Sequence, residues 1–145
     1  MIELSFSVRP EQGEPSGFDL GDMRCEGERG TATSVGHVPD QGMMIHLSVP
    51  LLLDSLRQLF GGASVASFTG VATSFRLDFR RTRNGRVTVS ARRKALGTAD
   101  LDELARAVLR PARKLAEEDL SRLPAGDGAV NDYLGSLRRF SAIAG

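Results

Sequence analysis

Hydrophobic and polar residues alternate most regularly between Ser74 and Ala91. The apolar positions of this stretch are Phe75, Leu77, Phe79, Val87, Val89 and Ala91, and charged or hydroxyl side chains stand between them. Period-two alternation is typical of a strand with one buried and one wet face. Asn84-Gly85 separates the two runs and is a strong signal for a tight turn. The pattern therefore predicts a β-hairpin over residues 75–91.

Two loop lengths are open for this hairpin, and they give different registers. A two-residue loop at Asn84-Gly85 sets Phe79 opposite Ser90, which mixes apolar and polar side chains on one face. A three-residue loop that also includes Arg83 sets Phe79 opposite Val89 and keeps the apolar face intact. We therefore expect a type I turn followed by Gly85 in the left-handed region, which forms a G1 bulge.

Other segments alternate in the same way. Residues 2–8, 43–49 and 65–71 are predicted as strands, and residues 22–35 as a weaker hairpin with its turn near residues 28–30. Residues 9–21 contain two prolines and three glycines and are predicted as a loop, with Phe18 and Leu20 expected to pin it to the core. Residues 94–98 are interpreted as a connection.

Three segments show helical spacing of apolar residues. Ser48 is predicted to cap a first helix, with Pro50 in its first turn, and Gly61-Gly62 to end it. Asp100 and Glu103 form a capping signature for a second helix over residues 100–123. Pro111 lies inside that helix, so we expect a kink or a break near residue 110. A last helix is predicted over residues 130–140.

The order of these elements predicts the fold class. Antiparallel strands interrupted by helices favour an α+β protein. We expect a single antiparallel sheet of about five or six strands, packed on one face by two or three helices. The length of 145 residues is that of one domain, so residues 1–145 are interpreted as a single domain.

Composition narrows the environment and the chemistry. The chain has one cysteine, Cys25, which excludes an internal disulfide and cysteine-based zinc sites. Neither a secretory signal nor an apolar run long enough to span a membrane is visible, so we expect a cytoplasmic protein. Residues 1–60 carry nine acidic and four basic residues, whereas residues 61–145 carry nine and fifteen. Such a split can steer a charged partner, or be neutralised within the fold.

Catalytic and metal-binding patterns are weak. His37, Asp40 and His46 could be proposed as metal ligands, but a turn and a strand need not converge. Cys25 lies beside Glu26 and Glu28, and carboxylates oppose formation of a thiolate nucleophile. The glycines form neither a Walker loop nor a dinucleotide fingerprint, and no nucleophile elbow is present. We expect no metal and no cofactor, and a non-enzymatic protein is preferred; a small-ligand-binding protein or an enzyme with an unrecognised pocket is kept as an alternative.

A basic cluster is the strongest candidate for function. It comprises Arg76, Arg80, Arg81, Arg83, Arg86, Arg92, Arg93 and Lys94, with Asp78 as the one acid among them. We take Arg76, Arg80, Arg83, Arg86 and Arg92 as candidate partner-binding residues. An acidic protein surface is the preferred partner over nucleic acid, because the hairpin's aromatic residues face inward and cannot stack on bases. A plain solvated face without a partner is the competing interpretation of the whole cluster.

The first two thirds of the chain resemble a known group of proteins. A short N-terminal strand, a leucine-rich helix that begins Pro50-Leu51-Leu52-Leu53, the stretch Phe68-Thr69-Gly70 and a following hairpin are similar to small WapI-like immunity proteins of bacterial polymorphic-toxin systems. The resemblance covers residues 2–91 and does not extend to the helix that contains Pro111. It implies a non-enzymatic bacterial protein that occludes a toxin.

The sequence thus predicts a small protein-binding module. Its contact surface is expected to be either the arginine face of the hairpin or the acidic segment at residues 11–28. A nucleic-acid-associated protein that uses the same arginines is the alternative. The oligomeric state stays open.

Overall fold

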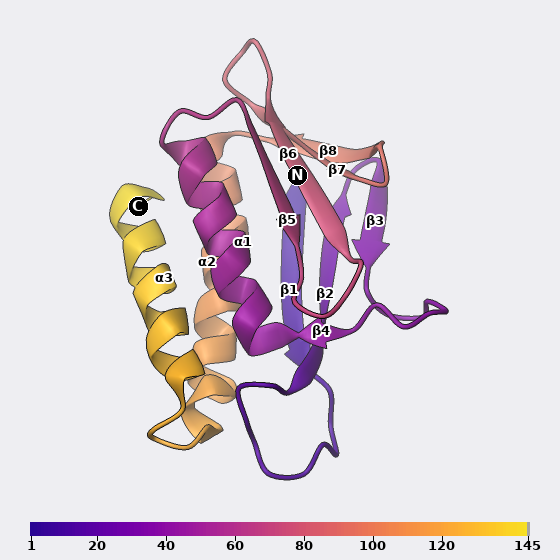
Figure 1. Cartoon of the computed structure of the whole chain (residues 1–145). Helices are drawn as coiled ribbons and strands as arrows, with labels where there is room; N and C mark the ends of the chain where they lie inside the picture. Colours follow the sequence, from indigo (N-terminus) through magenta and orange to yellow (C-terminus); the bar gives the residue numbers. More distant parts are fainter. Residues whose placement is uncertain (145) are drawn as a thin grey trace.

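The computed structural model describes residues 1–144 and contains two antiparallel sheets and three α-helices (Figure 1). The first sheet contains β1 (Ile2–Val8), β2 (Leu20–Gly27), β3 (Gly30–Thr33) and β4 (Met43–Met44). The second contains β5 (Val65–Thr69), β6 (Arg76–Arg81), β7 (Val87–Ala91) and β8 (Lys94–Ala99). The helices are α1 (Ile45–Phe60), α2 (Leu101–Glu118) and α3 (Gly128–Ala144), with a short 3₁₀ turn, η1 (Leu120–Arg122), before α3. The α+β class is therefore confirmed.

The prediction of one sheet with five or six strands is wrong, because the strands form two sheets of four. In the first sheet, β2 is central and pairs with β1, β3 and β4. The second sheet is a meander in the order β5-β6-β7-β8. Alternation shows that a strand has a buried face, but not which other strand it pairs with. The sequence pattern therefore found strands without assigning them to sheets.

The two sheets meet where β8 passes the β2–β3 turn. The N–H of Arg29 in that turn donates to the carbonyl of Leu96 at 2.8 Å. A Cβ atom at Gly27 would overlap the same carbonyl, so only glycine permits this close approach. The interpretation of residues 94–98 as a connection is wrong, because they belong to β8. Gly97 interrupts the apolar pattern of this segment, and a Cβ atom there would lie 3.1 to 3.2 Å from Glu28, Ile2 and Met1.

The hairpin of β6 and β7 has the register predicted from its apolar face. Phe79 lies opposite Val89, and Arg81 lies opposite Val87. The N–H of Gly85 donates to the carbonyl of Thr82 at 3.1 Å, which closes the turn, and Gly85 has a φ of +76°. The three-residue loop with Gly85 in the left-handed region is therefore confirmed.

Helix α1 begins earlier than predicted, and the strand expected at residues 43–49 is limited to β4. The helix begins at Ile45, and Pro50 lies inside it. Its first N–H groups find partners elsewhere in the fold, since the N–H of Ile45 donates to the carbonyl of Asp19 at 3.2 Å. Ser48 is not the cap. Its hydroxyl is buried and accepts the N–H of Val71 at 2.9 Å.

Helix α2 runs from Leu101 to Glu118 without a break at Pro111. Its predicted N-cap is confirmed, because the carboxylate of Asp100 accepts the N–H of Glu103 at 2.7 Å. The predicted last helix is also confirmed, as α3. The buried hydroxyl of Tyr133 in α3 donates to the carbonyl of Ala112 at 2.6 Å, which ties α3 to α2.

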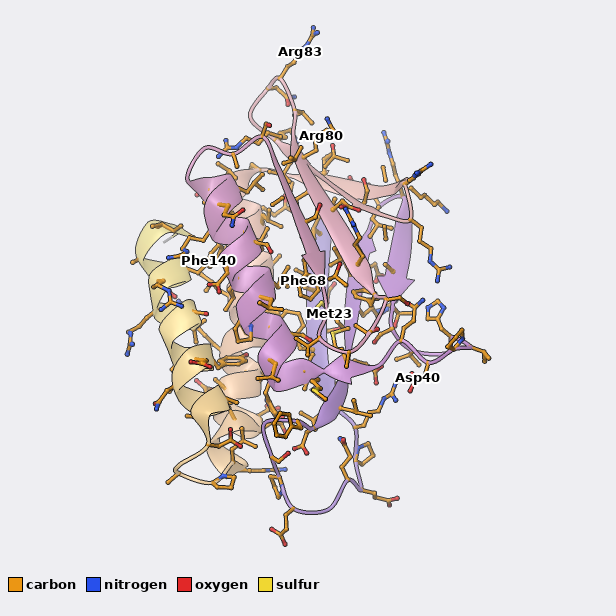
Figure 2. The ribbon with its side chains drawn as sticks, viewed as in Figure 1. Met23, Asp40, Phe68, Arg80, Arg83 and Phe140 are labelled. Atoms are coloured by element: carbon orange, nitrogen blue, oxygen red, sulfur yellow. The ribbon has the colours of Figure 1, made fainter. Side chains whose placement is uncertain are left out.

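The core lies between the helices and the two sheets, as Figure 2 shows for Met23, Phe68 and Phe140. Phe60 and Phe140 meet edge to face, with ring centroids 5.1 Å apart. Phe18 and Leu20 do not join this core as predicted, since both are exposed. The loop is held instead by Gln12, whose side-chain amide bonds the N–H and the carbonyl of Leu20.

Three consecutive leucines in α1 allow a matched stability test. Leu53 is fully buried, whereas Leu51 is 44% exposed. We predict that Leu53→Ala lowers the free energy of unfolding by about 2–5 kcal/mol, because it leaves a cavity in the core. Leu51→Ala should change it by less than about 0.5 kcal/mol. Urea denaturation measures both. Equal effects would contradict the orientation of α1.

Candidate functional site

A cleft of about 870 Å³ opens between β3 on one side and the β7–β8 turn and the start of β6 on the other. Its walls come from both sheets, beyond the point where β8 meets the β2–β3 turn. It is lined by Thr31, Ala32, Thr33, His37, Gln41, Ser74, Phe75, Arg76, Asp78, Ala91, Arg92, Arg93, Lys94 and Leu96. Volumes of this size accommodate a small molecule or a short peptide.

The β7–β8 turn brings two arginines to this cleft in an unfavourable backbone conformation. Ala91 pairs with Lys94, so Arg92 and Arg93 form a two-residue loop. Their φ angles are +52° and +65°, which is the left-handed region that a type I′ turn requires. Asn-Gly is the usual sequence for such a turn, and a bulky residue there costs energy. Strain of this kind often accompanies function.

The charges in the cleft are mostly uncompensated. Four cations line it, against the single carboxylate of Asp78. Asp78 forms an ion pair with Arg76 at 2.9 Å. Within residues 1–144, the side chains of Arg92, Arg93 and Lys94 have no carboxylate within salt-bridge distance. All three are exposed. The rim of the cleft therefore attracts an anionic ligand.

Apolar and hydroxyl groups complete the cleft. Leu96 and Phe75 are buried residues that border it, and Ala32 and Ala91 are half-buried. Thr31, Thr33 and Ser74 add hydroxyl groups. The cleft thus combines a cationic rim with an apolar lining, which suits an acidic ligand that also carries apolar side chains.

The five predicted partner-binding arginines do not converge on one site. Arg76 and Arg92 line the cleft, whereas Arg80 lines a smaller depression of about 340 Å³ on the outer face of the second sheet. Arg83 lies at the tip of the β6–β7 hairpin and points away from the body of the protein (Figure 2). Arg86 donates to the hydroxyl of Thr98 at 3.3 Å and lines neither cavity.

Arg81, another member of the basic cluster, has a structural role. Its guanidinium donates to the carbonyl of Leu59 at 2.5 Å and to that of Ala63 at 3.2 Å. A cation at the C-terminal end of a helix satisfies free carbonyls and offsets the helix dipole. Arg81 therefore anchors β6 to the end of α1.

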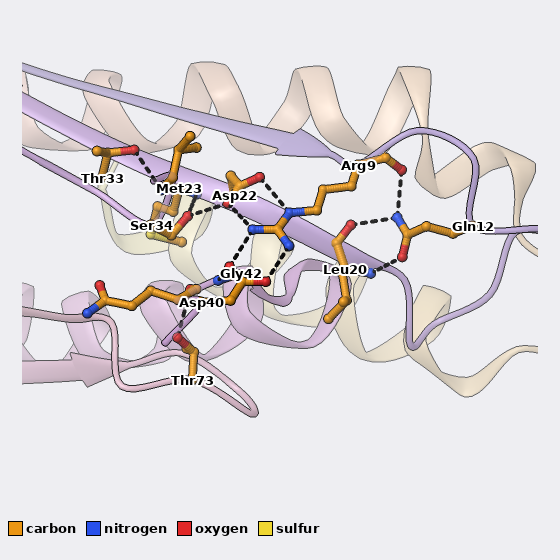
Figure 3. Close-up of polar contacts among 12 residues, drawn as sticks. Arg9, Gln12, Leu20, Asp22, Met23, Thr33, Ser34, Asp40, Gly42 and Thr73 are labelled. Carbon is orange, nitrogen blue, oxygen red and sulfur yellow. Dashed lines mark hydrogen bonds and ion pairs between the residues drawn. The ribbon is translucent and has the colours of Figure 1, made fainter. Parts of the chain in front are cut away.

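Arg9 holds the loop before β4 through the hydrogen bonds drawn in Figure 3. The same loop carries His37, which lines the cleft. The guanidinium of Arg9 donates to both carboxylate oxygens of Asp22, at 3.0 Å each, and to both of Asp40, at 2.6 and 2.8 Å. These hydrogen bonds lower the pKa of Asp22 and of Asp40 below their usual values. Arg9 therefore joins the end of β1 to β2 and to the loop before β4.

The same contacts weaken the acidic segment at residues 11–28 as a docking surface. Asp22 is bound by Arg9, and Glu26 lies 3.5 Å from Arg24. Glu11 and Glu14 are exposed and have no ion-pair partner within residues 1–144. Asp22 and Glu26 thus serve the fold, and only Glu11 and Glu14 of the four stay open to a partner.

The proposed metal ligands do not come together. Asp40 is bound by Arg9, and Nε2 of His37 lies 2.7 Å from the carbonyl oxygen of Thr33. His46 is not on a wet strand face but buried in α1. Among residues 1–144, no three His, Cys, Asp or Glu side chains are grouped so that they could hold a metal ion. Burial raises the pKa of Cys25 to about 12, which disfavours a thiolate.

A second basic depression, of about 660 Å³, follows α2 and was not singled out from the sequence. Its charged residues are Asp102, Arg106, Arg110, Arg113, Lys114 and Glu117. Acidic residues stand four positions from two of the arginines, which is the ordinary pattern of a solvated helix face. The cleft between the sheets is therefore the stronger candidate.

Sequence reasoning missed the contribution of β3. Thr31 and Thr33 belong to a four-residue strand in the weaker of the two predicted hairpins. Arg93 and Lys94 were in the basic cluster but not among the five selected residues. The tight turn at Arg92-Arg93 could not be predicted, because type I′ turns favour Asn and Gly and not two arginines.

Comparison with known protein families, curated proteins and solved structures yields no match for this chain. Within residues 1–144, no helix combines the length and the apolar character needed to cross a membrane. The functional interpretation therefore depends on the cleft itself.

We predict that Arg92→Asn combined with Arg93→Gly stabilises the protein by about 1 kcal/mol, because Asn-Gly adopts a type I′ turn with little strain. Thermal and urea unfolding measure the change. Arg83→Ala at the hairpin tip, where φ is not positive, is the control and should have little effect. A double variant that is less stable than the wild type would contradict the strain at this turn.

We also predict a pH dependence from His46. Burial lowers the pKa of His46, although nearby Asp19, Asp119 and Asp127 oppose this shift, and its Nδ1 has no hydrogen-bond partner among residues 1–144. The unfolded chain therefore binds a proton near pH 6.5 that the folded chain does not bind. Stability should fall as the pH decreases through about 6.5, by at most about 1.4 kcal/mol per unit, and level off below the folded pKa.

The control is His46→Gln, which cannot titrate. Urea denaturation between about pH 7.5 and 5 should show a smaller loss of stability in this variant than in the wild type. Identical slopes in the two proteins would show that His46 does not contribute.

Proposed function

We propose that this chain is a non-enzymatic binding module that holds an acidic segment of a partner protein in the cleft between its two sheets. The observation that carries the proposal is the Arg92-Arg93 turn. Two adjacent arginines occupy strained backbone positions at the rim, and neither has a carboxylate partner within residues 1–144. The fold places charge there at a cost in stability, which a bound anion would offset.

A protein partner is favoured over nucleic acid. Binding of single strands and of RNA usually requires exposed aromatic side chains on which bases stack. The one Phe, Tyr or Trp side chain that lines the cleft, Phe75, is 4% exposed, and Phe79 on the same hairpin is 1% exposed. Apolar groups beside the cations instead suit a polypeptide with mixed acidic and apolar residues.

The proposal includes the kind of partner and the cellular location. A toxin that is neutralised by occlusion is one partner of this kind, in line with the resemblance of residues 2–91 to WapI-like immunity proteins. A free, buried Cys25 is compatible with a cytoplasmic location. A toxin gene beside the gene for this chain would support the immunity role, and its absence would count against it.

The test is capture of a partner from a nuclease-treated lysate of the source organism. Wild-type protein is compared with Arg92→Glu/Arg93→Glu and with the control Arg83→Glu/Arg138→Glu. The control makes the same change in charge at exposed positions outside the cleft. We predict that wild type and control retain an acidic protein and that the cleft variant loses it.

Two results would overturn the proposal. One is capture that is equally strong with all three proteins. The other is that purified DNA or RNA binds the wild type with steep salt dependence and the cleft variant does not, which would favour nucleic acid.

A further inference from the structure

We propose that the partner segment enters the cleft in an extended conformation and adds to the first sheet as a strand along the free edge of β3. This inference rests on the proposed function and specifies how the partner is recognised. It follows from the hydrogen-bond pattern of β3, from the position of the cleft beside that strand and from the charges opposite it.

The hydrogen-bond pattern shows which groups of β3 are free. The N–H of Ser34, just after the strand, donates to the carbonyl of Met23 at 3.0 Å, and Ala32 lies opposite Cys25 in the same register. In an antiparallel pair, alternate residues direct both backbone groups to the same side. Ala32 therefore faces β2. Thr31 and Thr33 direct their N–H and C=O groups away from it.

One of these outward groups already has a partner. The carbonyl oxygen of Thr33 is 2.7 Å from Nε2 of His37. Within residues 1–144, the N–H of Thr33 and both backbone groups of Thr31 have no hydrogen-bond partner. Two donors and one acceptor are therefore available along the edge, and His37 closes the end at Thr33. This is the pattern that strand addition uses.

The cleft lies against this edge and not against a face of β3. Successive side chains of a strand point to opposite faces. Nevertheless, the consecutive residues Thr31, Ala32 and Thr33 all line the cleft. Contact with three consecutive strand residues indicates that the cavity borders the edge of the strand. An added strand would therefore occupy the cleft itself.

The rest of the cleft lining selects the side chains of the added strand. Arg92, Arg93 and Lys94 present uncompensated charge, whereas Leu96 and Phe75 are apolar. A strand places alternate side chains on opposite sides, so acidic residues can face the cations while apolar residues face the lining. The ligand is thus an extended segment in which acidic and apolar residues alternate.

The experiment uses a capped peptide of alternating glutamate and valine as the probe and the full-length protein. Binding is measured by isothermal titration and by the chemical shifts of backbone amides. Two further peptides carry N-methyl groups at every glutamate or at every valine, so that each loses the N–H donors of one edge. We expect one of them to bind about three- to tenfold more weakly, since its N–H can no longer donate to the carbonyl of Thr31, the one acceptor left free on this edge. A peptide with glutamine in place of glutamate should bind more weakly than the parent peptide, because it lacks the charges that attract the cations of the cleft.

A protein variant tests the same contact from the other side. Thr31→Pro removes an outward N–H and leaves the ladder bonds of Gly30 and Ala32 to β2 in place. It should weaken binding of the probe, whereas Thr31→Val should not. If Thr31→Pro does not fold, the N-methylated peptides on the wild-type protein decide the question.

Three outcomes would overturn strand addition. In the first, both N-methylated peptides bind as tightly as the parent. In the second, folded Thr31→Pro binds as tightly as Thr31→Val. In the third, the probe does not bind at millimolar concentration. The proposed function fails separately, through the capture experiment, because an acidic partner can depend on Arg92 and Arg93 without using the backbone of β3.

Discussion

The structure depends on the contact at which the β2–β3 turn meets β8. A backbone hydrogen bond from Arg29 to Leu96 joins the two sheets there, and Gly27 allows the chains to approach. Thr98 strengthens the junction, since its N–H donates to the carboxylate of Glu28 at 3.3 Å. The core lies on the helix side of this junction. The cleft lies on its other side, between β3 and the β7–β8 turn.

The same junction explains why the cations of the β7–β8 turn lie near the free backbone edge of β3. Strand β8 must return from the β7–β8 turn to reach the β2–β3 turn, and this return places Arg92 and Arg93 across from β3. Most proteins cover or charge their free strand edges to prevent unwanted pairing. Here the edge is short and faces cations across a cleft, so it favours acidic segments over other strands. The arrangement combines selectivity by charge with affinity from the backbone.

Local patterns in the sequence predicted individual elements well. The register of the hairpin followed from keeping Phe79 and Val89 on one face, and the cap of α2 followed from Asp100 and Glu103. The predicted start of α1 was wrong because Ile45 and Val49 fit both a strand and a helical period. In the structure, the carbonyl of Asp19 accepts the N–H of Ile45, and this contact favours the helix. The pairing of strands into two sheets depends on contacts distant in sequence. The cleft could not be predicted, because it lies between those sheets.

The most direct measurement is hydrogen exchange of the backbone amides in the free protein, resolved by residue with NMR. The account predicts that the amides of Thr31 and Thr33 exchange rapidly, because they point into an open cleft. The amide of Ala32, which lies between them and faces β2, should be protected. Equal protection of all three amides would show that the edge of β3 is covered, and would contradict the account.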